Sequence, residues 1–204
     1  MGLFAKETPE KKFWSWFKKN ESKIFLSDVS YNSEVQKLSQ KLSEYKDGVT
    51  YEISGEENGK KELVLSADGI KKLFPFVQAL YKSAPKFERW SIIAFRPRMD
   101  DFSKVNLKYS GKEFDPTDLW IYHKIKDGFF DLIIYHPEFS EEEKNIFISG
   151  TFILLDIVLG EYDVVTGIRY IDIQKLPEDP KNKGLVPFIE LRNIFDKYKN
   201  DTKH

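Results

Sequence analysis

The stretch WIYHKIKDGFFDLIIY, residues 120–135, decides the fold class of this chain. Apolar and polar side chains alternate on both sides of the central Asp-Gly pair, and such a pair between two alternating runs is typical of a two-residue hairpin turn. We therefore predict strands at Trp120–Lys126 and Phe129–Tyr135. A two-residue turn places Lys124 opposite Asp131, which predicts a cross-strand ion pair.

A second hairpin and several helices surround this one. Asn58-Gly59 is the strongest short turn signal in the chain, and apolar residues precede and follow it. Apolar side chains at helical spacing predict the helices. The first helix starts at Thr8-Pro9, and the next two span about Ser33–Tyr45 and Asp68–Ser83. A fourth runs from the capping sequence at Ser140 to Leu159, and the last spans about Pro187–Lys199.

Helices and strands come in clusters along the chain rather than in strict alternation. This order favours an α+β fold with a largely antiparallel sheet, because regular βαβ repeats are the pattern that parallel sheets require. We expect one domain over residues 1–204. The N-terminal helical pair, residues 1–47, is expected either to pack into that domain or to form a semi-separate appendage of it.

The composition removes several classes of function. The chain has no cysteine and only three histidines, so thiol nucleophiles, disulfides and iron–sulfur clusters are excluded. Its 32 basic and 33 acidic residues nearly cancel, whereas nucleic-acid binding needs cations that neutralise phosphates. The longest apolar run, Ile146–Leu159, is shorter than a membrane span. We expect a cytoplasmic protein with no nucleic-acid partner, no cofactor and no metal.

The first helix carries the most suggestive surface. Phe13, Trp14, Trp16 and Phe17 fall in one arc of it, and lysines occupy the opposite side. Trp14 and Trp16 are therefore candidates for a contact surface with another protein. Packing on its own domain would produce the same pattern. A membrane-surface helix is a third, weaker interpretation, because no second basic segment strengthens it.

Four further residues are candidates for a cleft: Arg96, Arg98, Asp156 and Glu161. The two arginines follow an apolar strand, where a guanidinium can bind a carboxylate or phosphate. Asp156 lies in an apolar helix and must be paired, hydrogen-bonded or neutral. Internal salt bridges explain these residues equally simply. The sequence shows no nucleophile or oxyanion-binding group beside these residues, so the interpretation as internal salt bridges is preferred.

The two internal histidines lack the sequence context of a catalytic or metal site. His123 lies on the apolar face of the hairpin, which indicates a core or rim position. His136 precedes Pro137 at a strand end, where it could reach a cleft. No second ligand stands at zinc-like spacing from either residue.

Several distinctive motifs are spread over most of the chain. They are Phe13-Trp-Ser-Trp-Phe17 with Asn20-Glu21, Leu63-Val-Leu-Ser-Ala-Asp-Gly69, Ala84-Pro85 through Trp90 to Ala94-Phe-Arg-Pro-Arg98, Leu159-Gly-Glu-Tyr-Asp163 and Leu185-Val-Pro-Phe-Ile-Glu-Leu191. Their combination resembles a family of uncharacterised soluble bacterial proteins. The resemblance implies a bacterial, cytoplasmic protein and carries over no activity or site.

The sequence as a whole favours a non-enzymatic binding or protein-interaction module. The alternatives are a small carboxylate-based hydrolase or transferase that uses the candidate cleft, and peripheral membrane association through the first helix. The oligomeric state stays open.

Overall fold

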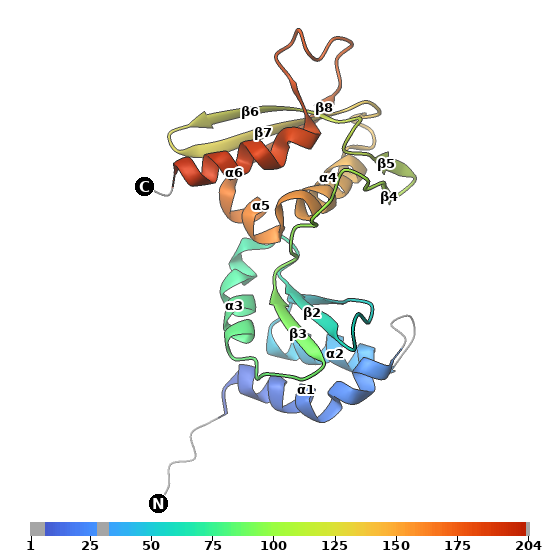
Figure 1. The fold of residues 1–204 in the computed structure, drawn as a ribbon, viewed down its shortest axis with the longest axis vertical. Coiled ribbons are helices and arrows are strands. Elements are labelled where there is room, and N and C mark those ends of the chain that lie inside the picture. The colour runs from blue at the N-terminus through green and yellow to red at the C-terminus, as the bar shows by residue number, and fades with distance from the viewer. Residues whose placement is uncertain (1–6, 28–32, 203–204) are drawn as a thin grey trace, which may run out of the picture. The chain divides into compact units, whose positions relative to one another are not determined.

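The structure, a computed structural model, describes residues 7–27 and 33–202 and has an α+β fold. The chain divides into two compact units, Met1–Arg96 (unit 1) and Pro97–His204 (unit 2), each of which is described here by itself. Figure 1 shows unit 1 in blue to green and unit 2 in yellow-green to red. Within the described residues, no helix is long and apolar enough to cross a membrane.

Unit 1 is a three-stranded sheet with helices. Its elements are α1 (Pro9–Leu26), α2 (Ser33–Tyr45), β1 (Thr50–Ile53), β2 (Lys61–Ser66), a 3-10 turn (Lys71–Leu73), α3 (Phe74–Lys82) and β3 (Trp90–Ala94). The sheet order is β1-β2-β3; β1 and β2 are antiparallel, and β3 runs parallel to β2. The connection through α3 supplies the crossover that a parallel pair needs.

The local signals of unit 1 explain its elements. Thr8 caps α1 by accepting a hydrogen bond from the Lys11 amide, and Pro9 takes the first position of the helix. The predicted turn at Asn58-Gly59 forms with both residues at positive φ, 51° and 75°. Pro75 interrupts the predicted Asp68–Ser83 helix, so a 3-10 turn precedes it and the α-helix begins afresh at Phe74.

Unit 2 is built on a four-stranded sheet. Its elements are β4 (Leu107–Tyr109), β5 (Lys112–Phe114), β6 (Trp120–Lys126), β7 (Phe129–His136), α4 (Lys144–Leu159), α5 (Glu161–Gly167), β8 (Ile168–Lys175), β9 (Val186–Pro187), a 3-10 turn (Phe188–Glu190) and α6 (Leu191–Asp201). The sheet order is β8-β7-β6-β9, and β4 and β5 form a separate small hairpin. β7 and β8 are parallel, whereas the other pairs of unit 2 are antiparallel.

The central hairpin has the predicted register. Asp127 and Gly128 have φ values of 54° and 75°, which fit the two-residue turn, and Lys124 lies opposite Asp131. The carboxylate of Asp131, however, receives a bidentate contact from Arg169 on the neighbouring strand β8. The hairpin register is confirmed. The principal partner of Asp131 is Arg169, which lies outside the hairpin and therefore could not be predicted from the hairpin register.

The core of unit 2 lies between one face of the sheet and its helices. Alternate residues of β6 and β7, among them Ile121, Leu132 and Ile134, are fully buried against α4 and α6. Figure 1 shows these helices on one side of the sheet and the β8–β9 loop rising from the other. The opposite residues of the same strands therefore lie on a face that the helices do not cover.

Candidate functional site

The aromatic face of α1 serves mainly the interior of unit 1. Trp14 is only 3% exposed, and its indole N–H donates to the Leu80 carbonyl of α3 at 2.8 Å. Its ring lies edge-on to Phe17 and close to Phe87. Trp14 is thus a core residue and does not contribute to a contact surface. The apolar face on which a membrane-bound helix would depend is occupied by the unit's own core.

Trp16 differs from Trp14 because it stays half-buried at the edge of that face. It lines a groove between α1 and α2 with a volume of about 410 Å³. We call this the Trp16 groove; its apolar walls are Pro9, Phe13, Trp16 and Tyr45, and its charged residues are Glu7, Lys12, Lys41 and Glu44. Of the two predicted contact residues, Trp16 alone lies on an accessible surface.

Internal contacts involve three residues of the groove, Tyr45, Lys41 and Glu44. The Tyr45 hydroxyl contacts Glu10 at 3.2 Å and donates to the Phe76 carbonyl at 2.9 Å. Burial, and then the Glu10 charge, raise the pKa of Tyr45, so this phenol stays protonated and neutral. Lys41 pairs with Glu44 at 2.6 Å, and its hydrogen bond lowers the pKa of the Glu44 carboxyl. The groove therefore has apolar walls, of which Tyr45 is held by hydrogen bonds, and a rim of both charges.

The two candidate arginines each pair with carboxylates. Arg96 belongs to unit 1, where it contacts Glu52 and binds Asp68 at 3.0 Å. Arg98 belongs to unit 2, where it binds Asp196 at 2.8 Å and Asp163 at 3.2 Å. Hydrogen bonding from Arg98 to Asp196 raises the pKa of this guanidinium. Each arginine thus forms the internal salt bridges that the structural interpretation predicts.

The two acids of the predicted cleft lie near the junction of α4 and α5. Asp156 is half-buried in the last turns of α4, and Glu161, the first residue of α5, is fully buried. Neither is without an interaction partner. Asp163 at this junction binds Arg98, one of the predicted cleft arginines, and Lys199, which the sequence did not single out. The three residues come from distant segments, so no local motif could have indicated the contact with Lys199.

His136 is a core residue and does not reach a cleft, which corrects the expectation from its place before Pro137. It is 2% exposed, and its ring contacts Phe114 and Phe147. Its Nδ1 accepts the Glu138 amide at 3.0 Å, so Nε2 carries the proton and donates to the Glu113 carbonyl, also at 3.0 Å. Burial lowers the pKa of His136 and keeps the imidazole neutral.

His123 also has a structural environment. Its ring stacks on Phe130 with the centroids 5.7 Å apart, and burial lowers its pKa. Across the described residues, no group of three or more histidines and acids is arranged to hold a metal ion. Both internal histidines are therefore explained by packing.

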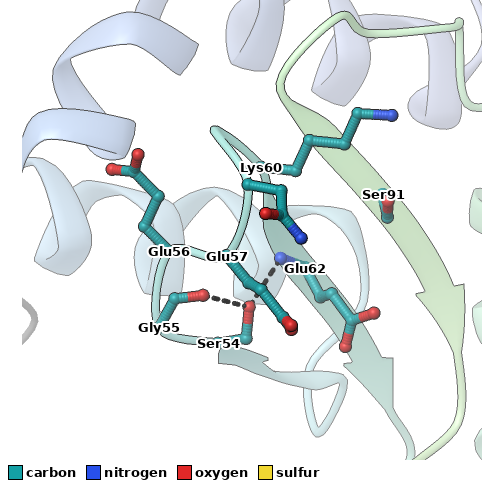
Figure 2. A pocket seen from close by; sticks show the side chains of 8 residues that line it. Ser54, Gly55, Glu56, Glu57, Lys60, Glu62 and Ser91 are labelled. Carbon is teal, nitrogen blue, oxygen red and sulfur yellow. Dashed lines mark hydrogen bonds between the residues drawn. The ribbon is translucent and has the colours of Figure 1, made fainter.

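A polar hollow of about 730 Å³ lies beside the β1–β2 loop (Figure 2). The Ser54 hydroxyl donates to the Gly55 carbonyl and accepts from the Glu62 amide, each at 2.8 Å. Three carboxylates, from Glu56, Glu57 and Glu62, line the hollow, and all three residues are exposed. Exposed charged side chains are ordinary on a protein surface, so this hollow gives no specific indication of a ligand.

No family model, curated protein or solved structure matches this chain. The resemblance to a family of bacterial proteins stays a prediction.

Proposed function

We propose that this chain is a non-enzymatic protein-interaction module that binds its partner in the Trp16 groove. The proposal depends on a difference in exposure among the aromatic side chains of α1. Trp14, Phe13 and Phe17 are buried in unit 1, while the large ring of Trp16 remains accessible beside Tyr45 and Pro9. Tryptophan and tyrosine in such settings dominate the energy of protein interfaces.

The groove indicates the chemistry of its partner. Its volume of about 410 Å³ admits one or two large side chains rather than a whole helix. Aromatic walls with a proline favour an extended segment that inserts an apolar anchor, as in other aromatic-lined grooves. Lys12 and Glu44 give the rim both signs of charge. We therefore propose a peptide segment with an apolar anchor and flanking polar residues as the ligand.

Selection from a random peptide library on the full chain tests this proposal. We expect enrichment of peptides with a large apolar residue, and Trp16→Ala is expected to weaken the selected peptides at least tenfold in calorimetry, because the anchor loses its main wall. The control is Phe129→Ala, which removes an exposed aromatic ring from the other unit. Equal binding by Trp16→Ala and the wild type would refute the proposal.

The proposal includes a cytoplasmic location in a bacterial cell, which the resemblance stated above supports. Fractionation of cells that express the tagged chain would check the location. Recovery in the membrane fraction at low salt would instead favour a peripheral membrane protein.

A further inference from the structure

The face of the unit 2 sheet that is free of helices carries aromatic side chains. Tyr122 on β6 and Tyr135 on β7 belong to the residues that alternate with the buried ones. Tyr135 pairs in register with Trp120, so Tyr122 is its diagonal neighbour across the two strands, within reach of a long side chain. Tyr122 is 43% exposed. This face therefore presents ring surfaces and hydroxyl groups side by side.

A hollow of about 520 Å³ lies over these tyrosines, which is within the range of small-molecule sites. Ile133 contributes to it from the sheet, and the loop between β8 and β9 contributes Pro177 and Leu185. Apolar and aromatic side chains thus form part of the walls, and polar groups form the rest. This hollow lies wholly within unit 2, whereas the Trp16 groove belongs to unit 1.

The polar residues of the hollow are cationic or neutral. Lys175 and Lys183 line it together with Gln174, and its eight lining residues include no carboxylate. Asp172, which lies opposite Ile133 on the neighbouring strand β8, accepts a hydrogen bond from the Gln174 amide at 2.9 Å. Lys175 donates to the Pro137 carbonyl, whereas Lys183 is exposed on the loop. The charge of the lining therefore complements an anion.

The tyrosine hydroxyl on the floor adds a donor. Burial raises the pKa of Tyr135, and the negative charge of Asp172 raises it further. The phenol is protonated at physiological pH, so its O–H is available for an anionic oxygen.

We infer that this hollow binds a small aromatic anion, a planar ring that carries a carboxylate or a phosphate. The ring lies against Tyr122 and Tyr135, because aromatic groups favour offset or edge contacts with one another. The acid group meets the ammonium of Lys183 and the tyrosine hydroxyls, which give charge-assisted hydrogen bonds. This inference is independent of the proposed peptide groove, since no residue is common to the two sites.

Titration of the full chain, followed by two-dimensional amide NMR, tests the inference. The probes are phenyl phosphate and benzoate, which distinguish a phosphate from a carboxylate. Inorganic phosphate and benzyl alcohol test the charge alone and the ring alone. We expect at least one aromatic anion to shift the amides of Tyr122, Ile133 and Leu185, with a dissociation constant at least tenfold below those of both simpler probes.

Two variants and two controls locate the site. Tyr122→Ala and Lys183→Gln are each expected to weaken the aromatic anion at least fivefold, because one removes the stacking surface and the other the cation. Tyr170→Ala and Lys126→Gln replace an exposed tyrosine and an exposed lysine outside the hollow and should bind like the wild type. Equal affinity for benzyl alcohol or inorganic phosphate, or shifts confined to other residues, would overturn the inference.

Discussion

His136 illustrates what a single buried polar residue does for unit 2. Its two nitrogens join the end of β7 to the Glu113 carbonyl of β5 and to the Glu138 amide. Satisfying both groups inside the core avoids the cost of about 1–3 kcal/mol for each unpaired buried polar group. The side chain fulfils this role only while it is neutral, because protonated Nδ1 could no longer accept.

The stability of the protein is therefore expected to fall as the pH drops below the ordinary histidine value of 6.5. The folded pKa of His136 is lowered, so the unfolded chain takes up this proton first, and acid shifts the equilibrium toward unfolding. The contribution is fully present above pH 6.5 and declines below it, by at most about 1.4 kcal/mol per pH unit for one proton. Urea unfolding at pH 7.5 and 5.5 measures the effect.

Two variants separate His136 from the other titrating groups. His136→Gln keeps a donor for Glu113 but cannot titrate, so the difference between the two pH values should shrink. His123→Gln controls for the second histidine whose pKa burial lowers. An unchanged pH dependence in His136→Gln would show that this imidazole does not control the acid sensitivity.

The two tryptophans of α1 show, also at the residue scale, how far the sequence could predict the candidate site. Two positions in a helix are separated by about 200°, so Trp14 and Trp16 stand at opposite edges of the predicted aromatic arc. Only packing against Leu80 and Phe87 decides that the Trp14 edge is covered. The composition of the arc predicted an aromatic face correctly but could not indicate which edge would stay accessible.

At the scale of elements, Gly150 allows α4 to approach the β4–β5 hairpin. A Cβ at this position would lie 2.1 Å from the Phe114 ring, which is itself fully buried. Gly150→Ala should therefore destabilise the protein by about 1–3 kcal/mol, as overpacking does. This outweighs the gain of roughly 1 kcal/mol that alanine brings to a helix interior. Urea unfolding monitored by circular dichroism checks the prediction.

The matched control for this prediction lies one residue away. Ser149→Ala also places alanine in α4 but at a half-buried position, so its effect should stay within about 0.5 kcal/mol. Gly150→Ala combined with Phe114→Leu should lose less stability than the two single changes added together, because the smaller side chain relieves the clash. A stable Gly150→Ala variant would contradict the tight contact between α4 and β5.

The sequence predicted elements best where their signals are local. The Ser33–Tyr45 helix, the Asn58-Gly59 and Asp127-Gly128 turns and the end of α4 at Gly160 are confirmed. The prediction was less accurate where two local signals conflict. In the third helix, the helical spacing of apolar residues continues across Pro75, whereas the proline favours a new helix start. Near Ser140, half of the predicted capping box forms, because the Ser140 hydroxyl accepts from the Glu143 amide at 3.4 Å. The Glu143 carboxylate pairs with Lys112 instead of completing the box, and α4 begins later, at Lys144.

At the scale of the whole molecule, the antiparallel pairs predicted from turns are joined by two parallel pairs that were not predicted. Strand β3 pairs with β2, and β8 pairs with β7, only after a helical crossover. Such pairing depends on the packing of segments distant in sequence, whereas a hairpin is specified by its own turn. The α+β class and the largely antiparallel character are confirmed. The strand order could be determined only from the structure.

The core of unit 2 leads to the last prediction, that residues 97–204 fold when expressed alone. Its continuous hydrophobic cluster is formed entirely by residues between Phe102 and Tyr198. At roughly a hundred residues, unit 2 also has the commonest size of an independent domain. We expect dispersed amide NMR signals and a cooperative urea transition from the fragment, and Gly150→Ala should destabilise it by about as much as it destabilises the full chain. The sequence predicts one domain, and a folded fragment would show that this domain contains an autonomous part. A fragment without a cooperative transition would show instead that the hydrophobic cluster of unit 2 is insufficient without residues 1–96.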